Sequence, residues 1–123
     1  MTDRRDELVR RFGERSVANL EKAVGFCDDI HTMIVTEGRE AFLADRRSQW
    51  AAEMGLIRIG ETVNRLPKEL LQAYPGQPWR VIVAMRNFAA HQYDDLNPTR
   101  VWTTVAEHIP AMRAYLSHEV LGD

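Results

Sequence analysis

The chain has a single cysteine, Cys27, among its 123 residues, so no disulfide can form within it. Disulfides persist mainly in oxidising compartments, and residues 1–16 are highly charged and lack the apolar core of a secretory signal. No stretch approaches the roughly 18 consecutive apolar residues that cross a bilayer. These absences predict a protein of the cytoplasm that has no contact with the membrane.

Strong positive charge is also absent. The formal net charge is −2 and the pI is about 6.1, so any site for nucleic acid needs a local positive field. The sequence has no glycine-rich phosphate loop and no GxSxG motif. The four histidines, His31, His91, His108 and His118, show no HExxH spacing, and one cysteine cannot complete a zinc site with them. We therefore expect neither a metal nor a cofactor.

Helical periodicity dominates the sequence, and no segment alternates like a half-buried strand. One apolar stripe extends over residues 17–34, and Gly38 is expected to make the turn that follows it. A short helical turn is expected over residues 40–43. Asp45 is predicted to cap a long central helix that ends near Leu66.

Prolines mark the starts of the later helices. Pro67 is predicted at the first position of the short helix "PKELLQAY", and Pro78 opens the helix "PWRVIVAMRNFAAHQY". Asn97 is expected to cap the last helix, in which Pro110 predicts a kink. The pattern predicts an all-α fold, an up-down four-helix bundle with short accessory helices in a single domain, 1–123. The first sixteen residues are either an extra helix or a loose charged arm.

The central helix is apolar on two sides. Trp50, Met54 and Ile57 mark one stripe, which we call the outer stripe. The other stripe consists of Leu56, Ile59 or Gly60, Val63 and Leu66. A helix of this kind is either central in a bundle or shared with a partner chain. For Trp50, as for Trp79 and Trp102, packing in the core is predicted rather than stacking on a base.

The segment "MRNFAAHQYDD", residues 85–95, brings four chemically active side chains close together in the sequence. His91 can act as an acid or a base near neutral pH, and the Arg86 guanidinium suits phosphate oxygens. Asn87 can orient the imidazole or donate to a phosphate. These groups suit the cleavage of RNA by its own 2′-hydroxyl, which needs a base, an acid and a cation but no metal.

One histidine cannot easily serve as acid and base in the same step. A two-fold dimer would solve this by bringing His91 of each chain to a shared cleft, and the outer stripe offers such a dimer a surface to bury. The alternative is an ordinary helix end, where a histidine is favoured by the helix dipole and Arg86 pairs with Glu53 or Glu61. Glu61 either steadies the Arg86 guanidinium in a working site or is a solvated charge.

The segment "RNFAAHQY" fits the pattern R-x4-H-x-Y and resembles the HepT-like toxins, a branch of the HEPN superfamily of ribonucleases. The resemblance covers residues 17–116, including the central "FLADRRSQWAAEMGLIRIGETVNRLPKELLQAYPGQPWRVIVAMRN" and the last helix "VWTTVAEHIPAMRAYL". It implies an HEPN-like helical bundle and a homodimeric, metal-independent endoribonuclease. Arg86 and His91 would be the catalytic pair, and Asn87 the polar residue that follows the arginine.

The same resemblance implies a partner and a control point. The partner would be a nucleotidyltransferase antitoxin of the MntA type, in a type VII (HEPN/MNT) toxin–antitoxin system. It would attach AMP to Tyr93, and the bulky anion would block RNA by size and charge. Departures from the family pattern lie at Ala89, Ala90, Gln92 and Asp94. The carboxylates of Asp94 and Asp95 would repel RNA phosphates. A second hypothesis is a non-catalytic helical interaction module that a nucleotidyltransferase binds and modifies.

Overall fold

The computed structural model describes residues 3–84 and 97–123, and within them every regular element is helical. The expected all-α fold is therefore confirmed. The first elements are α1 (Arg4–Phe12), α2 (Glu14–Met33), the 3₁₀ helix η1 (Val35–Glu37), α3 (Arg39–Ala44), α4 (Arg46–Asn64) and α5 (Lys68–Ala73). Residues 79–84 are helical as well. The C-terminal part consists of α7 (Pro98–Thr103), the π-helical η3 (Thr104–His108), α8 (Ile109–Ala114) and the π-helical η4 (Tyr115–Val120).

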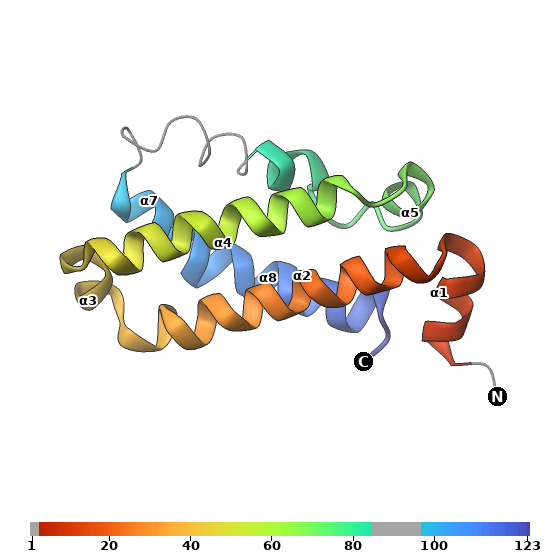
Figure 1. The fold of residues 1–123 in the computed structure, drawn as a ribbon, viewed down its shortest axis with the longest axis horizontal. Helices are drawn as coiled ribbons and strands as arrows, with labels where there is room; N and C mark the ends of the chain where they lie inside the picture. The colour runs from red at the N-terminus through yellow and green to blue at the C-terminus, as the bar shows by residue number, and fades with distance from the viewer. Residues whose placement is uncertain (1–2, 85–96) are drawn as a thin grey trace.

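The two long helices, α2 and α4, run side by side in opposite directions, and the C-terminal helical elements lie behind them (Figure 1). Gly55 of α4 permits close packing, because a Cβ atom there would lie 2.8 Å from Cδ1 of Ile30 on α2. The fully buried side chains come from all parts of the bundle: Leu8, Val17, Leu20, Phe42, Ile59, Val63, Leu70, Val105, Ile109, Leu116 and Val120. No helix in the described ranges is both long enough and apolar enough to span a membrane.

Most helix boundaries follow local signals in the sequence. The Asp45 carboxylate accepts a hydrogen bond from the backbone N–H of Arg47 at 2.9 Å, which confirms the predicted cap of α4. The Asn97 side chain caps α7 in the same way. Gly38 adopts φ +94°, a left-handed conformation that suits glycine, and so makes the predicted turn. Pro67 occupies the N-cap of α5, one position before the N1 site that was predicted.

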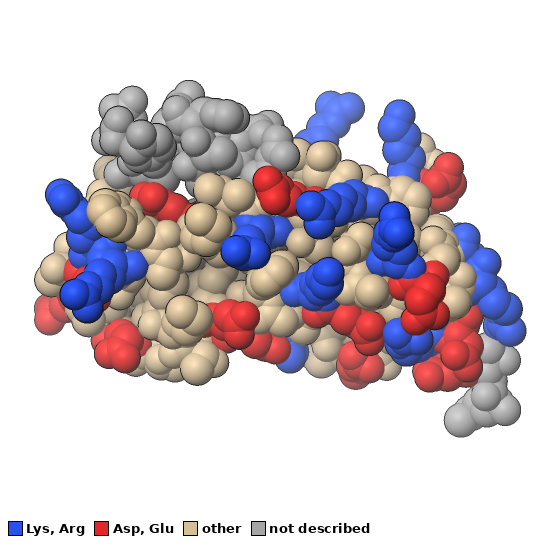
Figure 2. All heavy atoms as spheres, in the orientation of Figure 1, with Lys and Arg blue, Asp and Glu red and all other residues tan. Residues whose placement is uncertain are grey.

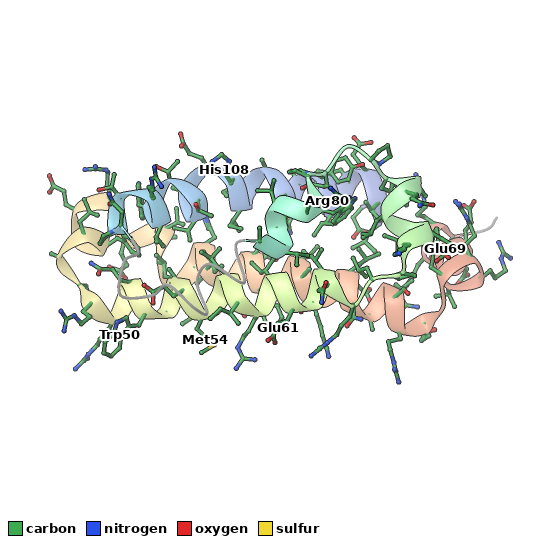
Figure 3. The ribbon with its side chains drawn as sticks, turned by 90° about the horizontal axis from the view of Figure 1, so that it is seen from above. Trp50, Met54, Glu61, Glu69, Arg80 and His108 are labelled. Atoms are coloured by element: carbon green, nitrogen blue, oxygen red, sulfur yellow. The ribbon has the colours of Figure 1, made fainter. Side chains whose placement is uncertain are left out.

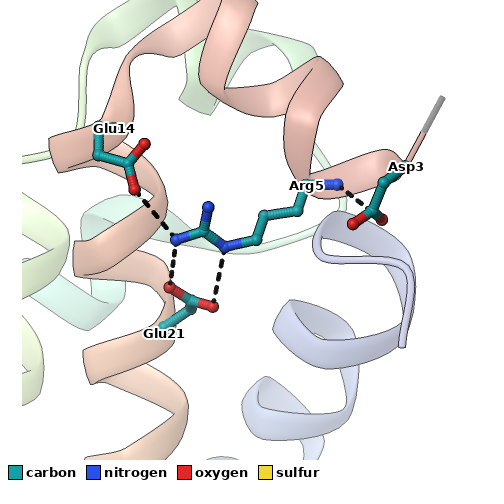
Figure 4. A network of polar contacts seen from close by, with 4 residues as sticks. All are labelled: Asp3, Arg5, Glu14 and Glu21. Carbon is teal, nitrogen blue, oxygen red and sulfur yellow. Dashed lines mark hydrogen bonds and ion pairs between the residues drawn. The ribbon is translucent and has the colours of Figure 1, made fainter.

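Residues near the N-terminus form a helix, the first of the two alternatives for this segment. Asp3 caps α1 through the backbone N–H of Arg5, whose guanidinium lies 3.1 Å from Glu14 and 3.3 Å from Glu21 on α2 (Figure 4). These ion pairs are exposed to solvent and add little to stability. Leu8 is 1% exposed, and its burial is the stronger reason for α1 to stay on the bundle.

The last helix is irregular where Pro110 predicted a disturbance. Pro110 has no N–H to donate to the carbonyl of Ala106. The chain forms the π-helical η3 just before it, in which the N–H of Ile109 reaches back to the carbonyl of Thr104. The second π-helical stretch, η4, follows without a proline to explain it.

Candidate functional site

The residues with predicted chemical roles, Arg86, Asn87, His91 and Tyr93, lie outside the described residues. The structure does describe the elements on either side of that segment. Helical residues 79–84 precede it and α7 follows it, and both lie beside α4 (Figure 1).

Glu61 is exposed on α4, along the same outward edge as Trp50 and Met54 (Figure 3). Its predicted pairing with Arg86 involves a residue outside the described ranges and remains a prediction. Glu53, the other acid considered for that pairing, is half-buried. Desolvation by burial raises the pKa of Glu53, so it keeps its proton to a higher pH than an exposed glutamate does.

The outer stripe of α4 is exposed at Trp50 and Met54, whereas Ile57 is half-buried. Trp50 is 63% exposed, so its predicted place in the core is wrong, and Met54 is 50% exposed. Helical periodicity correctly placed both residues on one stripe, but it does not reveal what covers that stripe. The Arg46 guanidinium lies 6.0 Å from the centre of the Trp50 ring, a cation–π contact that still leaves most of the indole in solvent.

A groove of about 280 Å³ lies between α2 and α4 next to this stripe. We call it the α2–α4 groove. Met33 of α2, which is 63% exposed, faces it together with Met54. Uncharged surface covers this part of α2 and α4 and is bordered by charged side chains (Figure 2). The groove is lined by Phe26, Asp29, Ile30, Met33, Ile34, Ala51, Met54, Gly55 and Arg58.

A second hollow of about 310 Å³ lies where α4, α5 and residues 79–84 meet. We call it the α4–α5 pocket. It joins apolar side chains to one amide and one guanidinium, a mixture typical of small-molecule sites. It is lined by Val63, Asn64, Leu71, Trp79, Arg80, Val83 and Ala84.

The wall of the α4–α5 pocket is fixed by hydrogen bonds from the loop that follows α5. The indole N–H of Trp79 donates to the backbone carbonyl of Tyr74 at 2.9 Å. The backbone N–H of Gly76 donates to the Tyr115 hydroxyl at 3.1 Å, which ties the loop to the C-terminal helix. The pocket is therefore formed by the folded chain before any ligand arrives.

The chain segment that supplies the lining of this pocket is basic, and Arg80 is the charged residue in the lining. The segment 63–84 contains three basic residues, Arg65, Lys68 and Arg80, and one acidic residue, Glu69, which gives it a net charge of +2. The whole chain carries −2. Neither Asn64 nor Arg80 belongs to a motif that predicts a site from the sequence. The net charge of +2 over residues 63–84 was the available signal, but the pocket itself depends on tertiary packing.

The remaining candidates show no organised site within the described residues. Cys27 is 3% exposed, and burial, helped by the nearby Asp28 charge, raises its pKa to about 12. This confirms the prediction of an inert, buried thiol. His31, His108 and His118 are all exposed, in keeping with the absence of a predicted role.

The fold places the chain in the class of all-helical bundle proteins. An apolar groove lies open between its helices α2 and α4. The sequence model of the family described as "Ribonuclease HepT-like" matches residues 23–119. That match covers well over half of the chain, and the chain belongs to this family. The described part of the fold agrees with the HEPN-like bundle that the resemblance implied.

Individual relatives agree with the family assignment. A Thermococcus cleftensis protein, provisionally named ribonuclease HepT, is 34% identical over 74 residues, which are 60% of this chain and 67% of its own. A Methanocaldococcus jannaschii protein, provisionally named as an RNase, is 28% identical over 83% of this chain and 78% of its own. A similarly named protein of Caldanaerobacter subterraneus is 30% identical over 76% of this chain and 83% of its own. No solved structure gives a significant match.

Proposed function

We propose that the chain is a metal-independent endoribonuclease. The observation that carries this proposal is membership of the HepT-like family together with the R-x4-H pattern at Arg86 and His91. The relatives named as ribonucleases support the same reaction class. No cofactor is required, because RNA supplies its own nucleophile in the 2′-hydroxyl group.

The proposed reaction is an attack of the 2′-oxygen on the adjacent phosphorus. His91 of one chain removes the 2′-hydroxyl proton, and the P–O bond to the 5′-oxygen breaks. His91 of the second chain gives a proton to that leaving oxygen. Arg86 stabilises the charge that develops on the phosphate oxygens, and Asn87 orients the imidazole or donates to the phosphate. The products are a 2′,3′-cyclic phosphate and a 5′-hydroxyl end.

The active form would be a homodimer. The exposed outer stripe and the α2–α4 groove support this part of the proposal, since they leave Trp50, Met54 and Met33 in water in the single chain. Large exposed apolar patches typically mark interaction sites. In a two-fold dimer the same patch contributes from both chains, so one apolar face suffices.

The cellular role would be that of a toxin in a type VII (HEPN/MNT) toxin–antitoxin system, acting in the cytoplasm. Its partner would be an MntA-type nucleotidyltransferase antitoxin that attaches AMP to Tyr93. The added phosphate would carry negative charge close to Arg86 and His91 in the sequence and would compete with RNA. Glu61 would support the Arg86 guanidinium.

Growth arrest tests this proposal. Expression of the chain alone should slow the growth of a host, and His91→Ala should relieve the arrest because it removes the proton-transfer group. His108→Ala is the matched control, since His108 is exposed on η3 and has no proposed role. Purified wild-type chain should also leave 2′,3′-cyclic phosphate ends on RNA in the presence of a chelator.

The second hypothesis, a non-catalytic module that a nucleotidyltransferase modifies, predicts another result. Wild-type and His91→Ala chains would then be equally harmless, RNA would stay intact, and the nucleotidyltransferase would still bind both. Intact RNA in the presence of the unmodified wild-type chain, together with a tryptic map showing that the nucleotidyltransferase adenylylates Tyr93, would favour the module over the ribonuclease.

A further inference from the structure

The α4–α5 pocket has an apolar base and a polar rim. Val63 and Trp79 are buried at its base, whereas Asn64 and Arg80 are exposed at its edge. Its volume of about 310 Å³ lies at the small end of ligand sites, which span roughly 300–1,000 Å³. A pocket of this size suits one ring system with a polar edge better than an extended ligand.

We propose that this pocket binds one unpaired nucleotide of an RNA substrate, an inference that rests on the ribonuclease function proposed above. The base would lie against the apolar side chains. The amide of Asn64, with two donor hydrogens and one acceptor oxygen, would read the edge of the base. The Arg80 guanidinium would contact a neighbouring phosphate.

The charge of the segment that lines the pocket, and the position of the pocket in the fold, support an RNA nucleotide as its ligand. The net charge of +2 over residues 63–84 supplies the local positive field that a chain of net charge −2 needs for binding a polyanion. Arg80 stands on the helical residues 79–84 above α4 (Figure 3). Ala84 lines the pocket, is the last described residue before the segment with the predicted reacting groups, and precedes Arg86 by two positions in the sequence.

The fixed wall of the pocket makes base preference the expected property. The Trp79 indole is held by its hydrogen bond to Tyr74, and the loop before it is held by the hydrogen bond from Gly76 to Tyr115, so the apolar base of the pocket keeps its place. A preformed site that hydrogen-bonds a ligand discriminates against ligands that leave its polar groups unpaired. A merely basic surface would hold RNA without regard to sequence.

Binding measurements with a non-cleaving chain test the proposal. The full-length His91→Ala chain is titrated into labelled single-stranded RNAs of about twelve nucleotides, a length within the usual site range. The set comprises oligo(U), oligo(C), oligo(A) and oligo(U) with guanines at its centre, and fluorescence anisotropy gives each dissociation constant. We expect one base to be preferred by about fivefold or more.

Two substitutions in the His91→Ala background separate the roles of the rim residues. Asn64→Leu keeps a similar volume but removes the hydrogen bonds, so the base preference should fall below about twofold. Arg80→Ala should weaken the binding of every RNA by a similar factor, about fivefold. It should also reduce the slope of log K against log salt by about 0.7, as the loss of one phosphate contact on a single strand does.

Arg39→Ala is the matched charge control, because Arg39 is exposed on α3, at the end of the bundle away from α5 (Figure 1). It should leave the base preference unchanged and weaken binding by less than about twofold. Circular dichroism and thermal unfolding confirm that each variant is folded. In addition, 4-thiouridine photocrosslinks should map to peptides within residues 63–84, and Ala84→Phe, which fills the mouth of the pocket, should abolish them.

Three results would overturn the pocket as a nucleotide site: equal binding of all four RNAs, an unchanged preference in Asn64→Leu, or equal losses in Arg39→Ala and Arg80→Ala. Each of them leaves the ribonuclease proposal standing if the wild-type chain cleaves RNA and arrests growth. Conversely, absence of cleavage and of arrest rejects the ribonuclease proposal, and base-selective binding with crosslinks in residues 63–84 would still support the pocket.

Discussion

Cys27 illustrates how one side chain is fixed by its surroundings. It lies on the inner face of α2, and burial is the main cause that raises its pKa to about 12, with Asp28 adding to the effect and Arg113 opposing it. The Arg113 guanidinium lies 2.9 Å from Asp28, so the two charges partly cancel at the thiol. The folded chain therefore holds Cys27 in its neutral form at any ordinary pH.

Iodoacetamide labelling at pH 8 should show this directly. The native thiol should react about 10²–10³-fold more slowly than the same thiol in the urea-unfolded chain, because the thiolate is the reactive form. Equal rates in the two states would mean that α2 opens readily or that the thiol is accessible. The Cys27→Ala chain, which cannot be labelled, sets the background.

The same shift makes folding stability depend on pH. The folded pKa is raised, so the unfolded chain loses its thiol proton first, and stability declines as the pH rises from about 9 toward 12. The predicted contribution of Cys27 is a loss of at most about 1.4 kcal/mol per pH unit in that window. Urea unfolding of the wild-type chain at pH 8 and pH 10, with Cys27→Ala as reference, measures it. Parallel pH curves for the two chains would contradict it.

Among the helices, α4 is stabilised at its N-terminus by its N-cap residue, Asp45. The Asp45 carboxylate accepts from the backbone N–H of Arg47 and from the Ser48 hydroxyl, at 2.9 and 3.0 Å. Asp45→Ala leaves that N–H without its side-chain partner and should lower the free energy of unfolding by about 1 kcal/mol. Asp45→Asn keeps an acceptor at the same place and should recover most of the loss. Urea titration compares the three chains, and equal losses in Ala and Asn would show that the cap is not the cause.

Sequence patterns predicted the helices wherever the signal was local. Asp45, Asn97 and Gly38 act through their own side chains or backbone conformation, and the structure confirms all three. Trp50 was misplaced because periodicity assigns a residue to a stripe, whereas exposure depends on what packs over that stripe. A prediction of this kind therefore needs the neighbouring elements as well as the helix itself.

Sequence patterns predicted only part of the candidate site. The R-x4-H pattern at Arg86 and His91 is a sequence signal, and its geometry lies outside the described residues. Asn64 and Arg80, at the α4–α5 pocket, come from two elements separated by a loop. No spacing rule joins them, because their proximity is produced by the turn at Pro67 and by the packing of Trp79 against α4 and α5.

At the scale of the whole molecule, α4 has one side that packs in the core and another side that is exposed to solvent. Its inner side is core, with Ile59 and Val63 fully buried, while its outer stripe meets water. Burial of apolar surface stabilises by roughly 25 cal/mol per Å². Association of two copies through the exposed outer stripe would therefore be favourable. The composite site needs the same event, because each chain supplies one His91 in the proposed reaction.

If the chain dimerises as proposed, Met54→Lys should convert the proposed dimer into a folded monomer. Met54 is 50% exposed, so a lysine is tolerated in the single chain but places like charges against each other at a two-fold interface. Light scattering after size exclusion should show the monomer mass, with unchanged thermal unfolding at low concentration and RNA cleavage reduced by about 10²-fold or more.

Val81→Lys is the matched control, since Val81 is 57% exposed but lies outside the groove and the outer stripe. A Met54→Lys chain that stays dimeric, or a Val81→Lys chain that dissociates, would place the interface elsewhere, and a monomer that cleaves at the wild-type rate would show that one histidine suffices.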